Sequence, residues 1–173
     1  MGARDTKGKR DGKGKSGDSG EETALPDVSV RSDVRITARY WNGAHTTHRL
    51  LFHLVWIPKY RRRVLEGAVA TRLRELFTQA CAVNGWGLHE LNVQPDHVHL
   101  LLQISPRESV AQVVNRLKGG SSRVLRAEFG ELEEFLWGES FWSDGYFAES
   151  VGQTQEDVIR RYIRNQDKAD QSQ

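Results

Sequence analysis

Two histidines separated by one residue are the first indication of chemistry in this chain. His97 and His99 flank Val98 at the start of an apolar segment that ends at Ile104. Successive side chains of a strand point to opposite faces, so both imidazoles would share one face while Val98 enters the core. Imidazoles about 7 Å apart along a strand can bind one divalent cation. A pair of half-exposed histidines without a ligand is the alternative, because H-x-H alone is a weak signal.

A tyrosine and a glutamine form the second candidate pair. Tyr162 and Gln166 are four residues apart, so they would stack on one face of a helix. A tyrosine in such a place is by default a core or interface aromatic. Near a bound cation, however, a phenol can ionise and attack phosphorus. The amide oxygen of Gln166 would then be available as a third metal ligand.

Lysine and arginine form three clusters, although the net charge is only +2. The clusters follow the first predicted strand, surround the Gly119-Gly120 pair and flank Tyr162. Around one sheet they would make a phosphate-binding rim, and a solvated surface is the alternative for each cluster. The candidates are Lys59, Arg61, Arg62, Arg63, Arg116, Lys118, Arg123, Arg160, Arg161 and Arg164. Aromatic residues that could stack on unpaired bases, or else lie in the core, are Tyr60, Trp86, Trp137 and Trp142.

The length and composition predict one domain with a polar extension. The chain has 173 residues and one cysteine, Cys81, which excludes a disulfide scaffold and a cysteine-rich zinc site. No apolar run approaches 18 residues and no signal sequence is recognisable, so we expect a cytoplasmic protein without a membrane partner. Residues 1–45 are predicted to be a disordered polar and basic tail, 46–168 the folded domain and 169–173 a frayed end.

Hydrophobic periodicity predicts an alternation of strands and helices. The expected strands are 49–58, 86–93, 97–104 and a short one around 146–148, and the expected helices are 67–84, 109–129 and 154–165. Gly119-Gly120 would be a possible break in the second helix. This order is typical of an α+β, ferredoxin-like split βαβ fold, also called RRM-like. It predicts a four-stranded antiparallel sheet with helices on one face and a C-terminal helix that carries the tyrosine.

Five motifs in order resemble one known family. They are F-H-L-V-W-I-P-K-Y-R-R at 52–62, P-D-H-V-H-L-L-L at 95–102, N-R-L-K-G-G-S-S-R at 115–123, F-W-S-D-G-Y-F at 141–147, and S-V-G at 150–152 with Y-I-R-N-Q at 162–166. This pattern resembles the single-tyrosine HUH transposases of the insertion-sequence 200/605 type, a superfamily with the repeat-associated tyrosine transposases. The resemblance covers about residues 46–167. The sequence departs from the family pattern at Gly120, where many relatives carry a larger residue.

The resemblance implies a reaction and its residues. His97 and His99 correspond to the HUH pair, Gln166 to the third metal ligand and Tyr162 to the nucleophile, with Mg²⁺ or Mn²⁺ as the cofactor. The tyrosine would cleave single-stranded DNA, leaving a 5′-phosphotyrosine link and a 3′-OH that later rejoins DNA. The basic candidates would then bind DNA.

Partners also follow from the resemblance. Members are homodimers that recognise imperfect DNA hairpins near the ends of the element, and no small-molecule substrate is expected. Their last helix can dock on the partner subunit, for which Gly152 would be the pivot. Whether Tyr162 acts in its own chain or in its partner is left open.

Other functions remain as alternatives. One is a non-mobile, repeat-associated HUH nuclease, or a replication or conjugation nickase on the same fold. A second is an inactive module that binds single-stranded nucleic acid, although such a sheet would carry aromatics where His97 and His99 stand. A metal hydrolase with H-x-H on a strand would need a barrel of about 250 residues.

Overall fold

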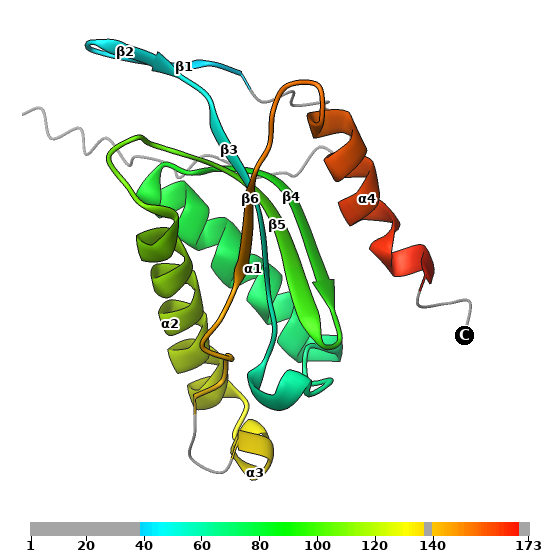
Figure 1. Cartoon of the computed structure of the whole chain (residues 1–173). Helices are drawn as coiled ribbons and strands as arrows, with labels where there is room; N and C mark the ends of the chain where they lie inside the picture. The colour runs from blue at the N-terminus through cyan, green and yellow to red at the C-terminus, as the bar shows by residue number, and fades with distance from the viewer. Residues whose placement is uncertain (1–38, 137–139, 170–173) are drawn as a thin grey trace, which may run out of the picture. The chain divides into compact units, whose positions relative to one another are not determined.

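The computed structural model describes residues 39–136 and 140–169 (Figure 1). Its elements are β1 (Trp41–Gly43), β2 (Thr46–His48), β3 (Leu50–Trp56), the 3₁₀ turn η1 (Lys59–Arg61), α1 (Gly67–Asn84), β4 (Gly87–Gln94), β5 (His97–Ile104), α2 (Val110–Glu128), α3 (Leu132–Leu136), β6 (Phe147–Ser150) and α4 (Glu156–Ala169). Most of the predicted tail, residue Trp137 and the last four residues lie outside these ranges. Within them, no helix has the length and apolar character that crossing a bilayer requires.

The main sheet has four strands in the order β4-β5-β3-β6. Each neighbouring pair is antiparallel, and β3 and β5 occupy the centre. The predicted α+β fold with a four-stranded antiparallel sheet is therefore confirmed. Because β3 and β5 are both central, side chains on either of their faces have neighbours on two sides.

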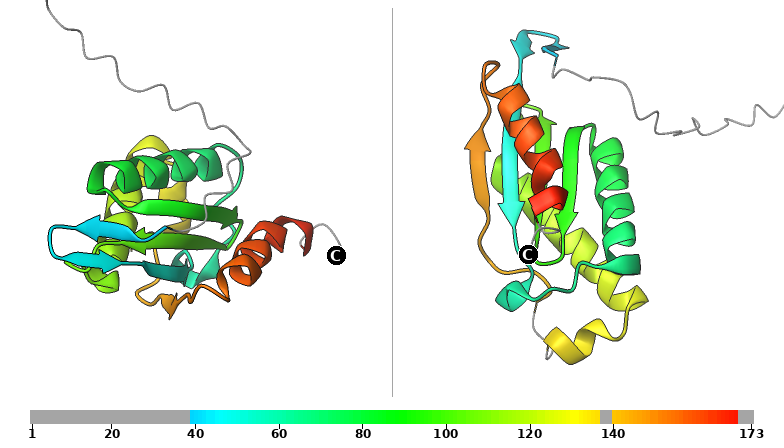
Figure 2. Two further views of the ribbon diagram at one scale, coloured as in Figure 1. Left: turned by 90° about the horizontal axis from the view of Figure 1, so that it is seen from above. Right: turned by 90° about the vertical axis from the view of Figure 1, so that its right-hand side faces the viewer.

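One face of the sheet carries the main hydrophobic core. Alternate residues of the central strands, among them Leu54, Val98 and Leu100, pack against the apolar stripes of α1 and α2. Figure 2 shows α1 and α4 separated by strands of the sheet. The other face is therefore the one on which residues such as His99 lie.

Helix α2 runs without a break through Gly119 and Gly120. Each glycine costs a helix about 1 kcal/mol relative to alanine, which suggested an interruption. The buried stripe of Val113, Leu117 and Leu125 continues on both sides of the pair and keeps the helix intact. A Ser109–Gln112 capping box fixes its N-terminus.

A short hairpin extends the fold before the predicted domain boundary. Strands β1 and β2 pair antiparallel, with Trp41 opposite His48. Strand β1 lies inside the segment 1–45 assigned to a tail, so folded structure begins earlier than predicted. An edge-on contact between Trp41 and His48 and a 2.9 Å hydrogen bond from Thr47 to Asn42 stabilise it. Strands this short give no alternation that a sequence pattern could reveal.

Helix α4 packs on the face of the sheet opposite to α1 and α2. Ile159 and Ile163 contact a small apolar cluster formed by Leu51, Leu101 and Val151. The face of the sheet opposite to α1 and α2 is therefore partly covered by the tyrosine-bearing helix of the same chain.

Buried charges add to this docking. Glu156, at the start of α4, pairs with Arg49 and with Arg160, and all three side chains are less than a tenth exposed. Arg160 also contacts Glu90 at 3.2 Å and His89 at 3.0 Å, both on β4, and Arg164 pairs with Glu90. Buried ions are tolerated only when they are paired, so this network ties α4 to the sheet in one position.

Replacing Gly120 with alanine should stabilise the protein. A Cβ at Gly120 meets no atom within 4 Å, so alanine should add about 0.5–1 kcal/mol to the free energy of unfolding in urea. Gly85→Ala is the control, because Gly85 ends α1 at φ +69° and alanine there should cost about 1 kcal/mol. A loss of stability in Gly120→Ala would contradict the packing of α2 described above.

Replacing Glu156 with glutamine should loosen α4. The change removes the negative charge that pairs with the buried guanidinium groups of Arg49 and Arg160, of which Arg160 keeps Glu90, and it should lower the free energy of unfolding by about 3 kcal/mol. Urea denaturation, together with hydrogen exchange in α4, measures the effect. Glu128→Gln removes the partner of Arg72 in an exposed pair and should change stability far less. Equal effects of both variants would show that the buried network does not hold α4.

Candidate active site

The register of β3 and β5 places three histidines on one face of the sheet. His97 and His99 alternate with Val98 on β5, and Val55 lies opposite His99 while His53 lies opposite Leu101. The ring centroids of His97 and His99 are 4.9 Å apart, with the rings nearly perpendicular. The ring of His53 stacks on that of His99 at 5.2 Å. The structure therefore brings together the predicted histidine pair and a third imidazole.

Each histidine of the predicted pair has its Nδ1 engaged by a neighbour. His97 Nδ1 lies 2.6 Å from Asp96 Oδ1, and Arg61 donates to the other oxygen of Asp96 at 2.8 Å. His99 Nδ1 lies 3.0 Å from His53 Nε2. In a histidine that binds a metal, the ring nitrogen that is not the ligand characteristically forms a hydrogen bond with a neighbouring group. The arrangement reserves Nε2 of both rings for a ligand.

Burial keeps the imidazole of His99 neutral. Burial is the largest of the causes that lower the pKa of His99 to about 4, and the neighbouring His97 and His53 contribute the rest. Burial also lowers the pKa of His53, against an opposing effect of Glu149. The burial of Asp96 opposes its charged form, but hydrogen bonds with His97 and Arg61 outweigh burial and lower its pKa. At neutral pH, His99 therefore offers a lone pair rather than a positive charge.

Tyr162 lies edge-on to the histidine cluster of its own chain. Its ring centroid is 5.7 Å from that of His99 and 6.2 Å from that of His53. The side chain is 51% exposed, whereas Ile163 beside it is buried. Docking by Ile163 and Arg160 thus leaves the phenol at the surface next to the imidazoles, where a macromolecular substrate can reach it.

The donor set fits a divalent cation in part. Two imidazoles whose Nδ1 atoms are engaged by neighbours suit Mn²⁺ and, with more oxygen ligands, Mg²⁺. No group of three His, Cys, Asp or Glu side chains within residues 39–136 and 140–169 is arranged to hold a metal ion. A cation would therefore need further oxygen ligands. The amide of Gln166 is a ligand of that type.

Gln166 shares a shallow pocket of about 390 Å³ with Tyr162. All residues that line it belong to α4, including Arg161 and Asn165, and neither His97 nor His99 contributes. Tyr162 and Gln166 thus share one side of the helix, as their spacing predicts. The convergence of Gln166 with the histidines stays a prediction.

The predicted basic rim is divided between exposed and structurally engaged side chains. Arg62, Arg63, Arg123 and Arg161 are exposed, and Arg63 pairs with Glu66 at 3.6 Å. Arg61, Arg116 and Arg164 are exposed as well, but they pair with Asp96, Glu108 and Glu90 respectively. Lys59 lies over the ring of Tyr60 at 5.7 Å. The ammonium of Lys118 donates to the carbonyls of residues 143–145.

Arg160 does not belong to this rim. Its guanidinium is buried between Glu156, Glu90 and His89, so it is not available to a phosphate. The sequence prediction that Arg160 contacts DNA is therefore corrected: Arg160 positions α4. A run of arginines gives no indication of which one faces inward.

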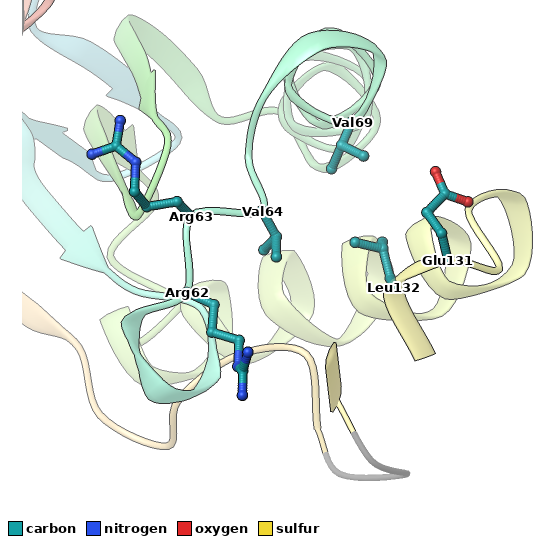
Figure 3. Close-up of a pocket in the computed structure, with 6 residues that line it drawn as sticks. All are labelled: Arg62, Arg63, Val64, Val69, Glu131 and Leu132. Carbon is teal, nitrogen blue, oxygen red and sulfur yellow. The ribbon is translucent and has the colours of Figure 1, made fainter. Parts of the chain in front are cut away.

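Arg62 and Arg63 border a second pocket, of about 310 Å³. Figure 3 shows Val64, Val69 and Leu132 lying between the two arginines and Glu131. Neither Tyr162 nor a histidine lines this pocket. Because none of its lining residues belongs to the histidine cluster or to α4, we do not assign it to the reaction.

The candidate stacking aromatics have different locations. Trp86 and Trp142 are buried and belong to the core. Tyr60 is exposed and adopts a left-handed backbone, as does Arg61, whose ion pair with Asp96 holds the turn beside the histidines. Phe147 on β6, which the sequence did not single out, is exposed and contacts His53 edge-on at 5.9 Å. Tyr60 and Phe147 are thus two exposed aromatic side chains that a substrate can reach.

Comparisons with known proteins agree with these features. Residues 46–166 match the family model described as "Transposase IS200 like". The chain is 36% identical over 124 residues to the ISDra2 transposase TnpA of Deinococcus radiodurans, covering 72% of this chain and 89% of that protein. It is 33% identical over 123 residues to the transposase for insertion sequence element IS200 of Salmonella typhimurium, covering 71% and 80%.

Solved structures give the same result. A crystal structure described as a putative transposase from Deinococcus radiodurans R1 superposes with a TM-score of 0.61 at 35% identity, over 73% of this chain and 97% of that one. A REP-associated tyrosine transposase bound to a REP hairpin shares the fold, with a TM-score of 0.53 at 11% identity over 72% and 70%. The predicted resemblance is thus confirmed: the chain belongs to the family of IS200-like transposases.

Proposed function

We propose that this protein cleaves and rejoins single-stranded DNA at the ends of an insertion sequence, with Tyr162 as the nucleophile. The observation that carries the proposal is the contact of Tyr162 with His99, whose ring also approaches His97. An exposed phenol beside two oriented imidazoles fits a phosphoryl transfer in which tyrosine holds the DNA covalently. Membership of the IS200-like transposases supports the same reaction.

The proposed reaction needs no external energy source, because one bond to phosphorus forms for each that breaks. The phenol oxygen of Tyr162 forms a bond to phosphorus, and the bond from phosphorus to the 3′ oxygen breaks. The phenol proton leaves and the departing 3′ oxygen becomes a hydroxyl. A later 3′-OH attacks the 5′-phosphotyrosine, so the phosphodiester is restored and the phenol is released.

The histidines are proposed to hold Mg²⁺ or Mn²⁺ through their Nε2 atoms, with Gln166 as a further ligand. Such a cation would neutralise and orient the scissile phosphate. Asp96 and His53 keep the two rings in place. Helix α4 positions Tyr162 by its buried ion pairs.

The substrate we propose is a DNA hairpin with an adjoining single strand. The structural neighbour bound to a REP hairpin supports this proposal at the level of the fold. The exposed arginines that follow η1, Arg62 and Arg63, and those of α4 would bind phosphates, and Phe147 would contact an unpaired base. We further propose that the protein acts as a homodimer, as the family resemblance implies, and that it acts in the cytoplasm.

Tyr162→Phe should abolish covalent capture of DNA. Wild type, incubated with Mn²⁺ and labelled single strands from the flanks of its own gene, should give an adduct that survives denaturation. The variant lacks the attacking oxygen and should give none, while its affinity for the hairpin should stay within about twofold because the ring remains. Denaturing gels and a filter-binding titration provide the two measurements.

Tyr60→Phe is the matched control for this experiment. It removes a hydroxyl from another exposed tyrosine and should leave adduct formation unchanged. Adduct formation by Tyr162→Phe would show that another group is the nucleophile. Hairpin binding without an adduct in wild type would point to a binding protein that has no cleavage activity.

His97→Ala should remove metal-dependent cleavage. With one imidazole gone, adduct formation should fall at least 100-fold at fixed Mn²⁺, and EDTA should reduce wild type to the same level. His45→Ala changes an exposed histidine of the β1–β2 hairpin and should have no effect. Full activity of wild type in EDTA would contradict the proposed cofactor.

A further inference from the structure

His53 is a buried polar residue that the proposed reaction does not require as a ligand or a nucleophile. Its side chain is on a central strand, with Leu101 of β5 on one side and Glu149 of β6 on the other. Only 5% of the residue is exposed. A buried imidazole must have a hydrogen-bond partner, and its Nε2 finds one in His99 Nδ1 at 3.0 Å. The two rings are nearly parallel, at 11°.

We propose that His53 is a positioning residue that fixes the tautomer and the orientation of His99. The inference rests on the proposed function, in which His99 binds a cation through Nε2. It adds a role for a residue that contacts neither the phosphate nor the cation.

Which of the two histidines donates this hydrogen bond decides whether His99 can bind a cation through Nε2. A neutral imidazole carries one proton, so His99 can bind a cation through Nε2 only when its proton is on Nδ1. His99 Nδ1 then donates and His53 Nε2 accepts. In the reverse arrangement His53 donates, His99 carries its proton on Nε2, and no lone pair faces the cation. The hydrogen bond therefore couples the two tautomers, and we propose that His53 Nε2 is the acceptor, which leaves the Nε2 lone pair of His99 for the metal.

The packing of the two rings restricts the orientation of His99 as well. His53 stacks on one side of His99, His97 approaches it edge-on, and Tyr162 contacts both His53 and His99 edge-on. A half-turn of the His99 ring about its χ2 angle would put Cδ2 in the place of Nδ1 and break the hydrogen bond with His53. His53 thus contacts Nδ1 of His99 as Asp96 contacts Nδ1 of His97.

Two substitutions separate the acceptor from the ring. His53→Phe keeps an aromatic ring for stacking but cannot accept a hydrogen bond. His53→Gln loses the ring but carries an amide oxygen at about the reach of Nε2, so it can accept from His99. If His53 acts through the hydrogen bond, His53→Phe should weaken binding of Mn²⁺ by 10–100-fold, and His53→Gln should recover most of it.

The measurement is a titration of the full chain with Mn²⁺ alone, followed by electron paramagnetic resonance. Thermal unfolding without metal and ¹⁵N chemical shifts of the His99 ring accompany it. In wild type the shifts should show a proton on Nδ1, and His53→Phe should move it to Nε2 while the melting temperature stays within a few degrees. His48→Phe, a change of a histidine on β2, is the control and should alter neither affinity nor tautomer.

The outcomes distinguish this inference from the function on which it rests. If wild type binds Mn²⁺ and His53→Phe binds equally well, the positioning role is refuted while the metal site stands. If His53→Phe lowers the melting temperature but the folded variant keeps wild-type affinity, His53 is structural only. If wild type and His97→Ala do not differ in Mn²⁺ binding, the proposed metal site itself fails, and the inference fails with it.

Discussion

The pairing register of β3 against β5 is the constraint on which the rest of the site depends. It places His53 near His99, two residues that are 46 positions apart in the chain. A slip of one residue would turn the histidines into the core and bring Leu100 and Leu54 to the surface. The apolar residues on the opposite face fix the register, because they must contact α1 and α2. Burial of the core on one face thus sets the geometry of the polar residues on the other.

The position of Tyr162 depends on a different kind of interaction. Helix α4 contributes few apolar contacts, chiefly Ile159 and Ile163, and its remaining attachment is ionic. Buried ion pairs add little net stability but discriminate strongly between positions, since a displaced charge would lose its partner inside the protein. An attachment of this kind suits a helix that must hold one residue in one place. It also explains why Arg160 resembles a DNA contact in sequence and serves as a support in the structure.

The sequence predicts those features that local signals determine. Asn84-Gly85 ends α1 where expected, because Gly85 adopts the left-handed conformation, and the Pro95-Asp96 turn fixes the start of β5. The shared face of His97 and His99 follows from alternation alone. The roles of His53 and Asp96 could not be predicted, since a strand histidine and a turn aspartate have no distinguishing spacing. Their partners become visible only when β3, β5 and η1 are placed together. The burial of Arg160 likewise depends on Glu90, 70 residues away.

The central claim, that Tyr162 carries the DNA, can be tested directly by locating the covalent link. Wild-type protein would be trapped with single-stranded DNA and Mn²⁺, digested with nuclease and protease, and analysed by tandem mass spectrometry. The account predicts one modified peptide, with a nucleotide joined through its 5′-phosphate to the oxygen of Tyr162. A nucleotide on any other residue would contradict the account, and so would cleavage to a free 5′-phosphate without a modified peptide.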